Sequence, residues 1–258
     1  MIADLRHAED VRLAWTLLAA SLATVLFSAP MLRAHFAETI AKARPPVRVP
    51  PVPVMFAAEA VKTALVSGFA SWAGLYAATR AGLDAPIFRA LLRHESATAA
   101  AALARALSVG APLGVAAFAV ATGLHRRFDG PPPDRATLPL RVQLTGVFYT
   151  AVFLEHWVDW GVLSLAICAL SAAGLPRLAA IAVAALVVAV AFGAFASISI
   201  RRKHPGEPHA LRQGILCYGL PGLLCIVALF AAGLESAMFA HASWVALRIL
   251  ITPRAVSS

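Results

Sequence analysis

Charge is scarce in this sequence, and its scarcity excludes an ordinary soluble domain. Only 14% of the 258 residues are charged, while 60% are hydrophobic. Soluble domains are typically about 25% charged and about 45–50% apolar. The apolar residues form long runs separated by short clusters of Arg, Pro and Gly. Because a spanning helix needs roughly 20 mostly apolar residues, the pattern predicts an integral membrane protein.

Common catalytic and redox motifs are also absent. The sequence has no phosphate-binding P-loop, no G-x-S-x-G nucleophile turn and no H-E-x-x-H zinc motif. Its three cysteines, Cys168, Cys217 and Cys225, lie in apolar runs and form no C-x-x-C pair. An odd number also suits no complete set of disulfides. We therefore interpret the cysteines as small core residues.

What the sequence does contain are about seven long hydrophobic runs, which predict an all-α polytopic bundle in one transmembrane domain, residues 1–258. The expected spans cover residues 13–30, 55–79, 98–124, 141–172, 177–200, 211–232 and 235–252. A Pro-rich linker at 43–54 cannot be helical throughout. Residues 82–95 are too short and too charged to cross, so they predict a short interfacial helix.

The first run has an alternative interpretation as the apolar part of a signal peptide. Asp4, Glu9 and Asp10 precede it, whereas a signal peptide begins with a clearly positive segment. We therefore expect residues 13–30 to be retained as a span.

Basic residues outnumber acidic ones by 22 to 13, giving a net charge of +9. They gather in the segments that follow odd-numbered spans, such as Arg126, Arg127 and Arg201. The positive-inside rule then puts the N-terminus outside and the C-terminus in the cytoplasm, which we expect for a bacterial cytoplasmic membrane. Such loops contact anionic headgroups. Membrane lipids are therefore the expected partners of this charge, and nucleic acid is not.

The fourth run carries the densest set of ionisable residues, Glu155, His156 and Asp159. A spacing of three or four residues on a helix makes Asp159 a neighbour of both others. Ionisable groups inside a bilayer are costly and indicate function by default, and His can hold a proton or a metal ion. Alternatively, Trp157 and Trp160 favour the membrane interface, where the same patch would simply be solvated. The seventh run adds a lone His241. Its two interpretations are a ligand and a hydrogen-bonded packing residue.

Two stretches resemble motifs of the CAAX protease and bacteriocin-processing (CPBP) family of intramembrane endopeptidases. LEHWVDWGVLSL at 154–165 is similar to the family motif Glu-Glu-x-x-x-Arg and its Trp-Gly continuation, and GLESAMFAHASWV at 233–245 to the final His-x-x-x-Asn/Asp motif. Weaker similarity lies at 218–224 and 68–92. The resemblance covers about residues 50–252 and implies a membrane-embedded peptide hydrolase that acts on a membrane-protein or peptide substrate.

Most positions that the resemblance implies are substituted. Aligned on Trp-Gly, the two family glutamates fall on Leu154 and Glu155, and the arginine falls on Asp159. A shift of one residue makes Glu155 the first glutamate and places His156 and Trp160 at the other two positions.

The other two family motifs are also incomplete. The Phe-x-x-x-His motif begins at Phe192 but ends at Ala196, and the final motif keeps His241 but ends at Val245. Only Glu155 and His241 match the implied set in both alignments.

Three hypotheses follow. The first is a degenerate, inactive CPBP-like protein that binds or escorts membrane proteins. It is favoured because the helices are present while most of the site is not. The second is an active, divergent endopeptidase with Glu155 as general base, His156 and His241 as ligands of a divalent metal such as zinc or as proton carriers, and Asp159 as the orienting group. The third is a proton-coupled transporter-like bundle built on Glu155, His156 and Asp159.

Overall fold

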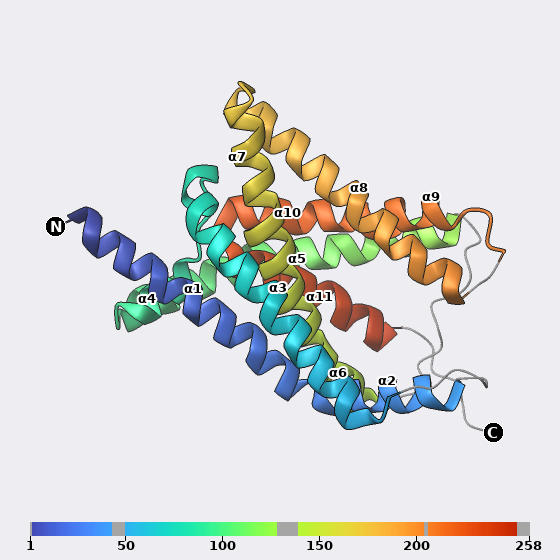
Figure 1. The fold of residues 1–258 in the computed structure, drawn as a ribbon. Coiled ribbons are helices and arrows are strands. Elements are labelled where there is room, and N and C mark those ends of the chain that lie inside the picture. The colour runs from blue at the N-terminus through green and yellow to red at the C-terminus, as the bar shows by residue number, and fades with distance from the viewer. Residues whose placement is uncertain (1, 43–49, 128–138, 204–205, 252–258) are drawn as a thin grey trace.

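The computed structural model describes residues 2–42, 50–127, 139–203 and 206–251, and every element in these ranges is helical (Figure 1). The first half of the chain forms α1 (Ile2–Phe27), α2 (Ala29–Lys42), α3 (Val52–Ala81), α4 (Pro86–Leu92) and α5 (Ser96–Arg127). The second half forms α6 (Leu140–Phe148), the π-helical segments η1 (Tyr149–Phe153) and η2 (His156–Leu163), α7 (Ser164–Ala172), α8 (Arg177–Lys203), α9 (Ala210–Gly214), the π-helical η3 (Ile215–Gly219), α10 (Leu220–Ala232) and α11 (Leu234–Ile251).

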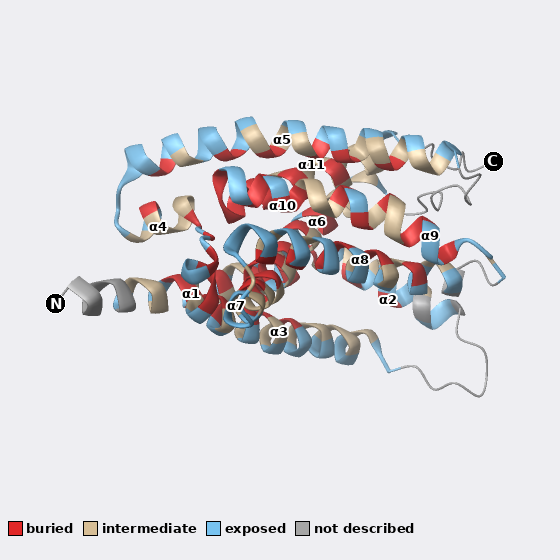
Figure 2. Ribbon diagram, turned by 90° about the horizontal axis from the view of Figure 1, so that it is seen from above, coloured by how far each residue is buried: buried red, intermediate tan, exposed pale blue. Residues whose placement is uncertain are grey.

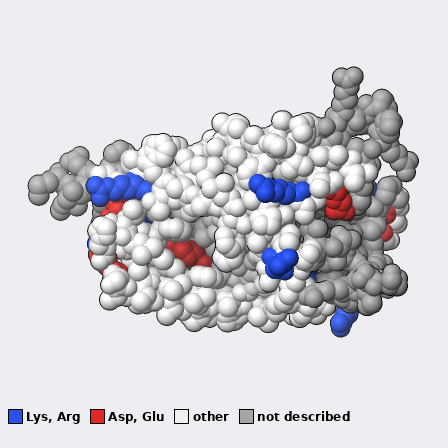
Figure 3. All heavy atoms as spheres, turned by 90° about the horizontal axis from the view of Figure 1, so that it is seen from below, with Lys and Arg blue, Asp and Glu red and all other residues white. Residues whose placement is uncertain are grey.

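Seven helical stretches among the described residues are long and apolar enough to cross a membrane, which confirms the predicted polytopic bundle. They are Ala8–Phe27, Val52–Ala81, Ser96–Arg127, Leu140–Ala172, Arg177–Arg201, Ala210–Ala232 and Leu234–Ile251. The fourth of them runs through α6, η1, η2 and α7, and the sixth through α9, η3 and α10. The face drawn in Figure 3 consists mostly of uncharged residues, as a surface in contact with lipid requires.

Two of the boundaries that differ from the sequence prediction involve proline. We expected the first span to end at Pro30, but α1 ends at Phe27 and Pro30 lies in the first turn of α2. Proline is well tolerated there, since the N–H that it lacks has no partner within the helix. Likewise α3 begins at Val52, inside the predicted linker, with Pro53 in its first turn. The remainder of that linker, 43–49, lies outside the described residues.

Small residues bring α5 close to α11 at the centre of the bundle. A Cβ atom added at Gly110 would lie 3.0 Å from Cβ of Phe239, and one at Gly114 would lie 2.7 Å from Cβ of Ser243. Glycines spaced four residues apart allow helix backbones to approach closely in a membrane. The opposite face of α5 is exposed along much of its length, as Figure 2 shows.

The α5–α11 contact leads to a stability prediction. Gly114→Leu should lower the free energy of unfolding by about 1–3 kcal/mol or more, because the new side chain must force the two helices apart. Gly123→Leu on the same helix is the control, since nothing lies within 4 Å of a Cβ atom added there. Unfolding by SDS in mixed micelles measures both variants. Equal midpoints would show that the close approach contributes nothing to stability.

A network of ion pairs ties α4 to α1 at the end of the bundle that carries the N-terminus. The guanidinium of Arg89 lies 3.1 Å from Glu9, 2.7 Å from Asp10 and 2.8 Å from Asp84, and Arg93 lies 2.8 Å from Glu9. Burial lowers the pKa of Arg89, but hydrogen bonds to Asp10 and Glu9 outweigh burial and raise it above its usual value. The network holds α4 against α1, and the predicted orientation in the membrane stays a prediction.

Candidate functional site

The span Leu140–Ala172 changes its helical geometry on both sides of Glu155. The π-helical segment η1 ends at Phe153, and η2 begins at His156. Such segments are rare and frequently mark functional sites. Gly161 in η2 allows close contact with α3, because a Cβ atom added there would lie 2.9 Å from Cβ of Ala70. The two π-helical segments of this span therefore flank Glu155.

Glu155 and His241 meet across the bundle although 86 residues separate them in the chain. Oε1 of Glu155 lies 2.5 Å from Nδ1 of His241, and both residues are only 5% exposed. A hydrogen bond between a carboxylate and an imidazole N–H is stronger and shorter than one between neutral groups. His241 of α11 thus orients the carboxyl group of Glu155 in the fourth span.

Asp159 completes the polar cluster one helical turn beyond Glu155. Both carboxyl groups border the same small cavity. Asp159 is 2% exposed, and its Oδ2 is buried without a hydrogen-bond partner among the described residues. An unpaired buried oxygen costs roughly 1–3 kcal/mol, more if it is charged. This oxygen therefore needs a partner that the described residues do not supply, such as a water molecule.

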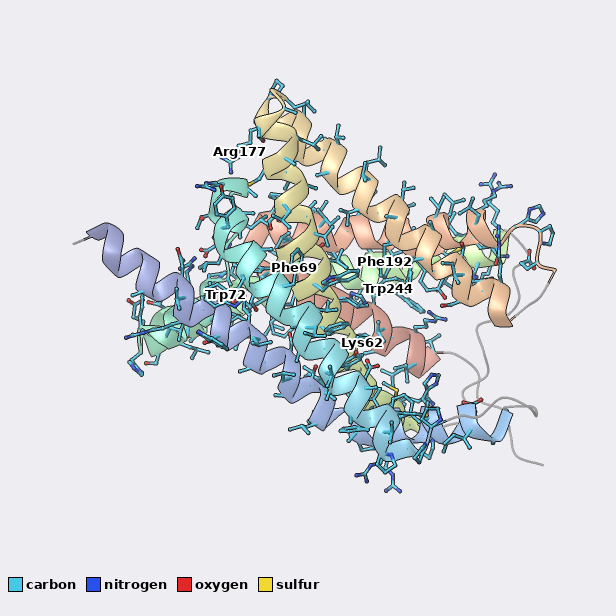
Figure 4. The ribbon with its side chains drawn as sticks, viewed as in Figure 1. Lys62, Phe69, Trp72, Arg177, Phe192 and Trp244 are labelled. Atoms are coloured by element: carbon cyan, nitrogen blue, oxygen red, sulfur yellow. The ribbon has the colours of Figure 1, made fainter. Side chains whose placement is uncertain are left out.

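The cluster borders a small cavity between the fourth, fifth, sixth and seventh spans. The cavity has a volume of about 30 Å³. Its polar lining comes from Glu155, Asp159 and His241, and its walls include Phe192 and Trp244, which Figure 4 shows between α8 and α11. A water molecule needs about 10–15 Å³ of such volume and two to four polar partners. The cavity therefore accommodates about two water molecules beside the carboxyl groups.

His156, which we predicted to act with the cluster, has a different place in the structure. Its Nδ1 lies 2.8 Å from Oγ of Ser21 in α1, and its Nε2 lies 3.0 Å from Oγ of Ser71 in α3. The residue is fully buried, and both ring nitrogens are engaged. Of the four predicted site residues, the structure therefore brings together Glu155, Asp159 and His241, and it places His156 in a separate contact between helices.

Cys225 is buried in an apolar cluster with Ala228 and Ala240, as its interpretation as a small core residue predicts, and it also lies near the polar cluster. One potential ligand atom from each of Glu155, Cys225 and His241 lies within 4.8 Å of the others. Carboxylate, thiolate and imidazole together form a donor set that suits Zn²⁺. These residues therefore fit a divalent metal better than the predicted pair of His156 and His241. No spacing in the sequence pointed to Cys225, because the three residues come from three different spans.

A second intramembrane polar contact also went unpredicted. The hydroxyl of Tyr149 donates a hydrogen bond to Glu59, and Nζ of Lys62 lies 2.5 Å from the same carboxylate. Lys62 is half exposed and can direct its ammonium group toward the membrane surface. This contact anchors η1 to α3, and none of its residues lines the cavity.

Comparison with known proteins does not identify the chain or its site. No family model, no curated protein and no solved structure matches the chain.

Proposed function

We propose that this chain is an intramembrane endopeptidase of the CPBP type with a substituted active site. In the proposal Glu155 is the general base, His241 holds and orients it, and Asp159 supplies a further polar group. The observation that carries the proposal is the 2.5 Å contact between Glu155 and His241 beside a cavity of about 30 Å³. The sequence alone favoured an inactive relative, and the convergence of these three residues changes that preference.

The proposed chemistry follows from the geometry of the cluster. When the proton of His241 is on Nδ1, the ring donates to Glu155 and leaves that side chain as a carboxylate. The carboxylate removes a proton from a water molecule in the cavity, and the water oxygen bonds to the carbonyl carbon of the substrate. The peptide C–N bond then breaks, and the proton passes from Glu155 to the departing amine. A positioned base of this kind contributes about 10²–10⁴-fold to a rate.

A second candidate function is retained because part of the cavity wall is apolar. Val188, Ala189 and Phe192 of α8 line it, and Ala196 stands at the position on this helix where the family resemblance implies a histidine. The cavity also has room for about two water molecules but not for a peptide segment. A protein that binds or escorts membrane proteins without cleaving them accounts for these two features.

One experiment separates the two functions in the cell that carries the chain. N-termini of membrane proteins are quantified in the wild type, a deletion strain, Glu155→Gln and the exposed control Glu95→Gln. Hydrolysis predicts new N-termini in or beside transmembrane segments of other proteins, present in the wild type and in Glu95→Gln. These N-termini should fall about 10²-fold or more in Glu155→Gln and in the deletion.

The escort function predicts a different outcome of the same experiment. The deletion would change the abundance of a membrane protein, while Glu155→Gln would leave that abundance and all N-termini unaltered. Identical N-termini in the wild type and in Glu155→Gln would overturn the endopeptidase proposal. Unchanged protein abundance in the deletion would overturn the escort function.

A further inference from the structure

We propose that Glu155, Cys225 and His241 form a binding site for a divalent transition-metal ion such as Zn²⁺, with Cys225 as its thiolate ligand. The three side chains come from the fourth, sixth and seventh spans, and one potential ligand atom from each lies within 4.8 Å of the others. They are 5%, 2% and 5% exposed, respectively. The site is therefore enclosed by protein.

The donor set determines the class of metal. Thiolate and imidazole ligands suit Zn²⁺ and similar transition metals, whereas Mg²⁺ and Ca²⁺ require oxygen ligands. Three protein ligands of mixed type, with one position left for water, are typical of catalytic zinc sites. Each residue contributes one atom, so the second oxygen of Glu155 remains available to a water molecule.

Asp159 provides an independent indication of a bound cation. Its Oδ2 is buried without a partner among the described residues, and the residue lines the same cavity as Glu155 and His241. None of the described side chains lining that cavity belongs to Lys or Arg. Two carboxyl groups and a nearby thiol thus share an apolar interior without a protein counter-charge. A divalent cation would supply that charge.

The contact between Glu155 and His241 is compatible with loading of the ion. Oε1 of Glu155 and Nδ1 of His241 lie 2.5 Å apart and share one proton in a hydrogen bond. A zinc ion would bind each of these atoms at about 2.0–2.2 Å and sulfur at about 2.3 Å. The two side chains must therefore rotate apart by a small amount as the ion replaces that proton. Cys225 also loses its thiol proton, and both protons pass to water.

The inference shares its residues with the proposed function, but metal binding is measured without cleavage. The full chain is purified in detergent, stripped with a chelator and titrated with Co²⁺. We expect one ion per chain, visible absorption typical of a tetrahedral site and a near-ultraviolet sulfur-to-cobalt charge-transfer band. Zn²⁺ should displace the bound Co²⁺.

Variants identify the ligands in this titration. Cys225→Ser should abolish the charge-transfer band and weaken Co²⁺ binding at least about tenfold. Glu155→Gln and His241→Gln should weaken binding similarly while Cys225 is present. Cys168→Ser and Cys217→Ser are the matched controls and should bind as the wild type does, because neither cysteine belongs to the cluster.

Several outcomes would overturn the inference: no binding at one equivalent, binding without the band, or a band that survives in Cys225→Ser. The proposed function is judged separately in the cell. If the purified protein binds no metal yet Glu155-dependent N-termini are found, only the metal inference is wrong. If the protein binds metal through Cys225 but no such N-termini exist, only the endopeptidase proposal is wrong.

Discussion

Glutamine in place of either Glu155 or His241 is expected to slow cleavage about 10²–10⁴-fold, and the double variant should be no slower than the single ones. The two side chains share one hydrogen bond at 2.5 Å in a buried site. A base without its orienting partner and a partner without its base are equally ineffective. Groups that act as a unit therefore give losses that do not add.

The measurement is the rate at which a new N-terminus forms on a substrate identified by the cellular comparison. Initial rates are taken for the wild type, both single variants and the double variant at equal protein levels. Glu95→Gln again serves as the exposed control. Losses that multiply in the double variant would show that the two residues act independently, and the paired mechanism would then be wrong.

His156→Leu is expected to lower the free energy of unfolding by about 1–3 kcal/mol. The substitution removes two buried hydrogen bonds, to Ser21 and to Ser71, and such bonds between membrane helices are worth about 0.6 kcal/mol on average and about 1.7 at most. It also leaves two serine hydroxyls without a partner in the interior. Ser21 belongs to α1 and Ser71 to α3, so we expect the substitution to weaken the packing of α1 against the other helices.

A triple variant distinguishes lost hydrogen bonds from a mere change of shape. Ser21→Ala, Ser71→Ala and His156→Leu together remove every partner, so this variant should regain part of the stability lost by His156→Leu alone. SDS titration monitors unfolding, and Ser108→Ala controls for loss of an exposed hydroxyl. If the triple variant is less stable than His156→Leu by the sum of the two serine losses, packing rather than hydrogen bonding determines the contact.

The spans were predictable from the sequence because a bilayer imposes both length and composition on a helix. The span that begins at Arg177, for example, starts where the sequence placed it. Helix α2 was not predictable in the same way. Pro30 predicts the end of a helix, but proline suits the first turn of the next helix equally well. A proline alone does not reveal on which side of it the helix lies.

The candidate site was predictable only within one helix. A spacing of four residues predicted Glu155 and Asp159 as neighbours, and both line the same cavity. The contact of Glu155 with His241 depends on how two spans pack, which no local pattern encodes. His156 adjoins Glu155 in the chain, yet it binds serines of α1 and α3. Consecutive residues of a helix do not point in the same direction.

The π-helical segments beside Glu155 affect how distance along this span should be counted. A π turn accommodates one residue more than an α turn before the chain returns to the same face. Between Glu155 and Gly161 most of the backbone belongs to η2, so two chains with equivalent side-chain positions can differ there by one residue. That difference equals the offset between the two alignments of this stretch with the CPBP motif. Sequence spacing in this stretch is therefore a weaker guide to which side chains share a face than it is in the α-helical part of the span.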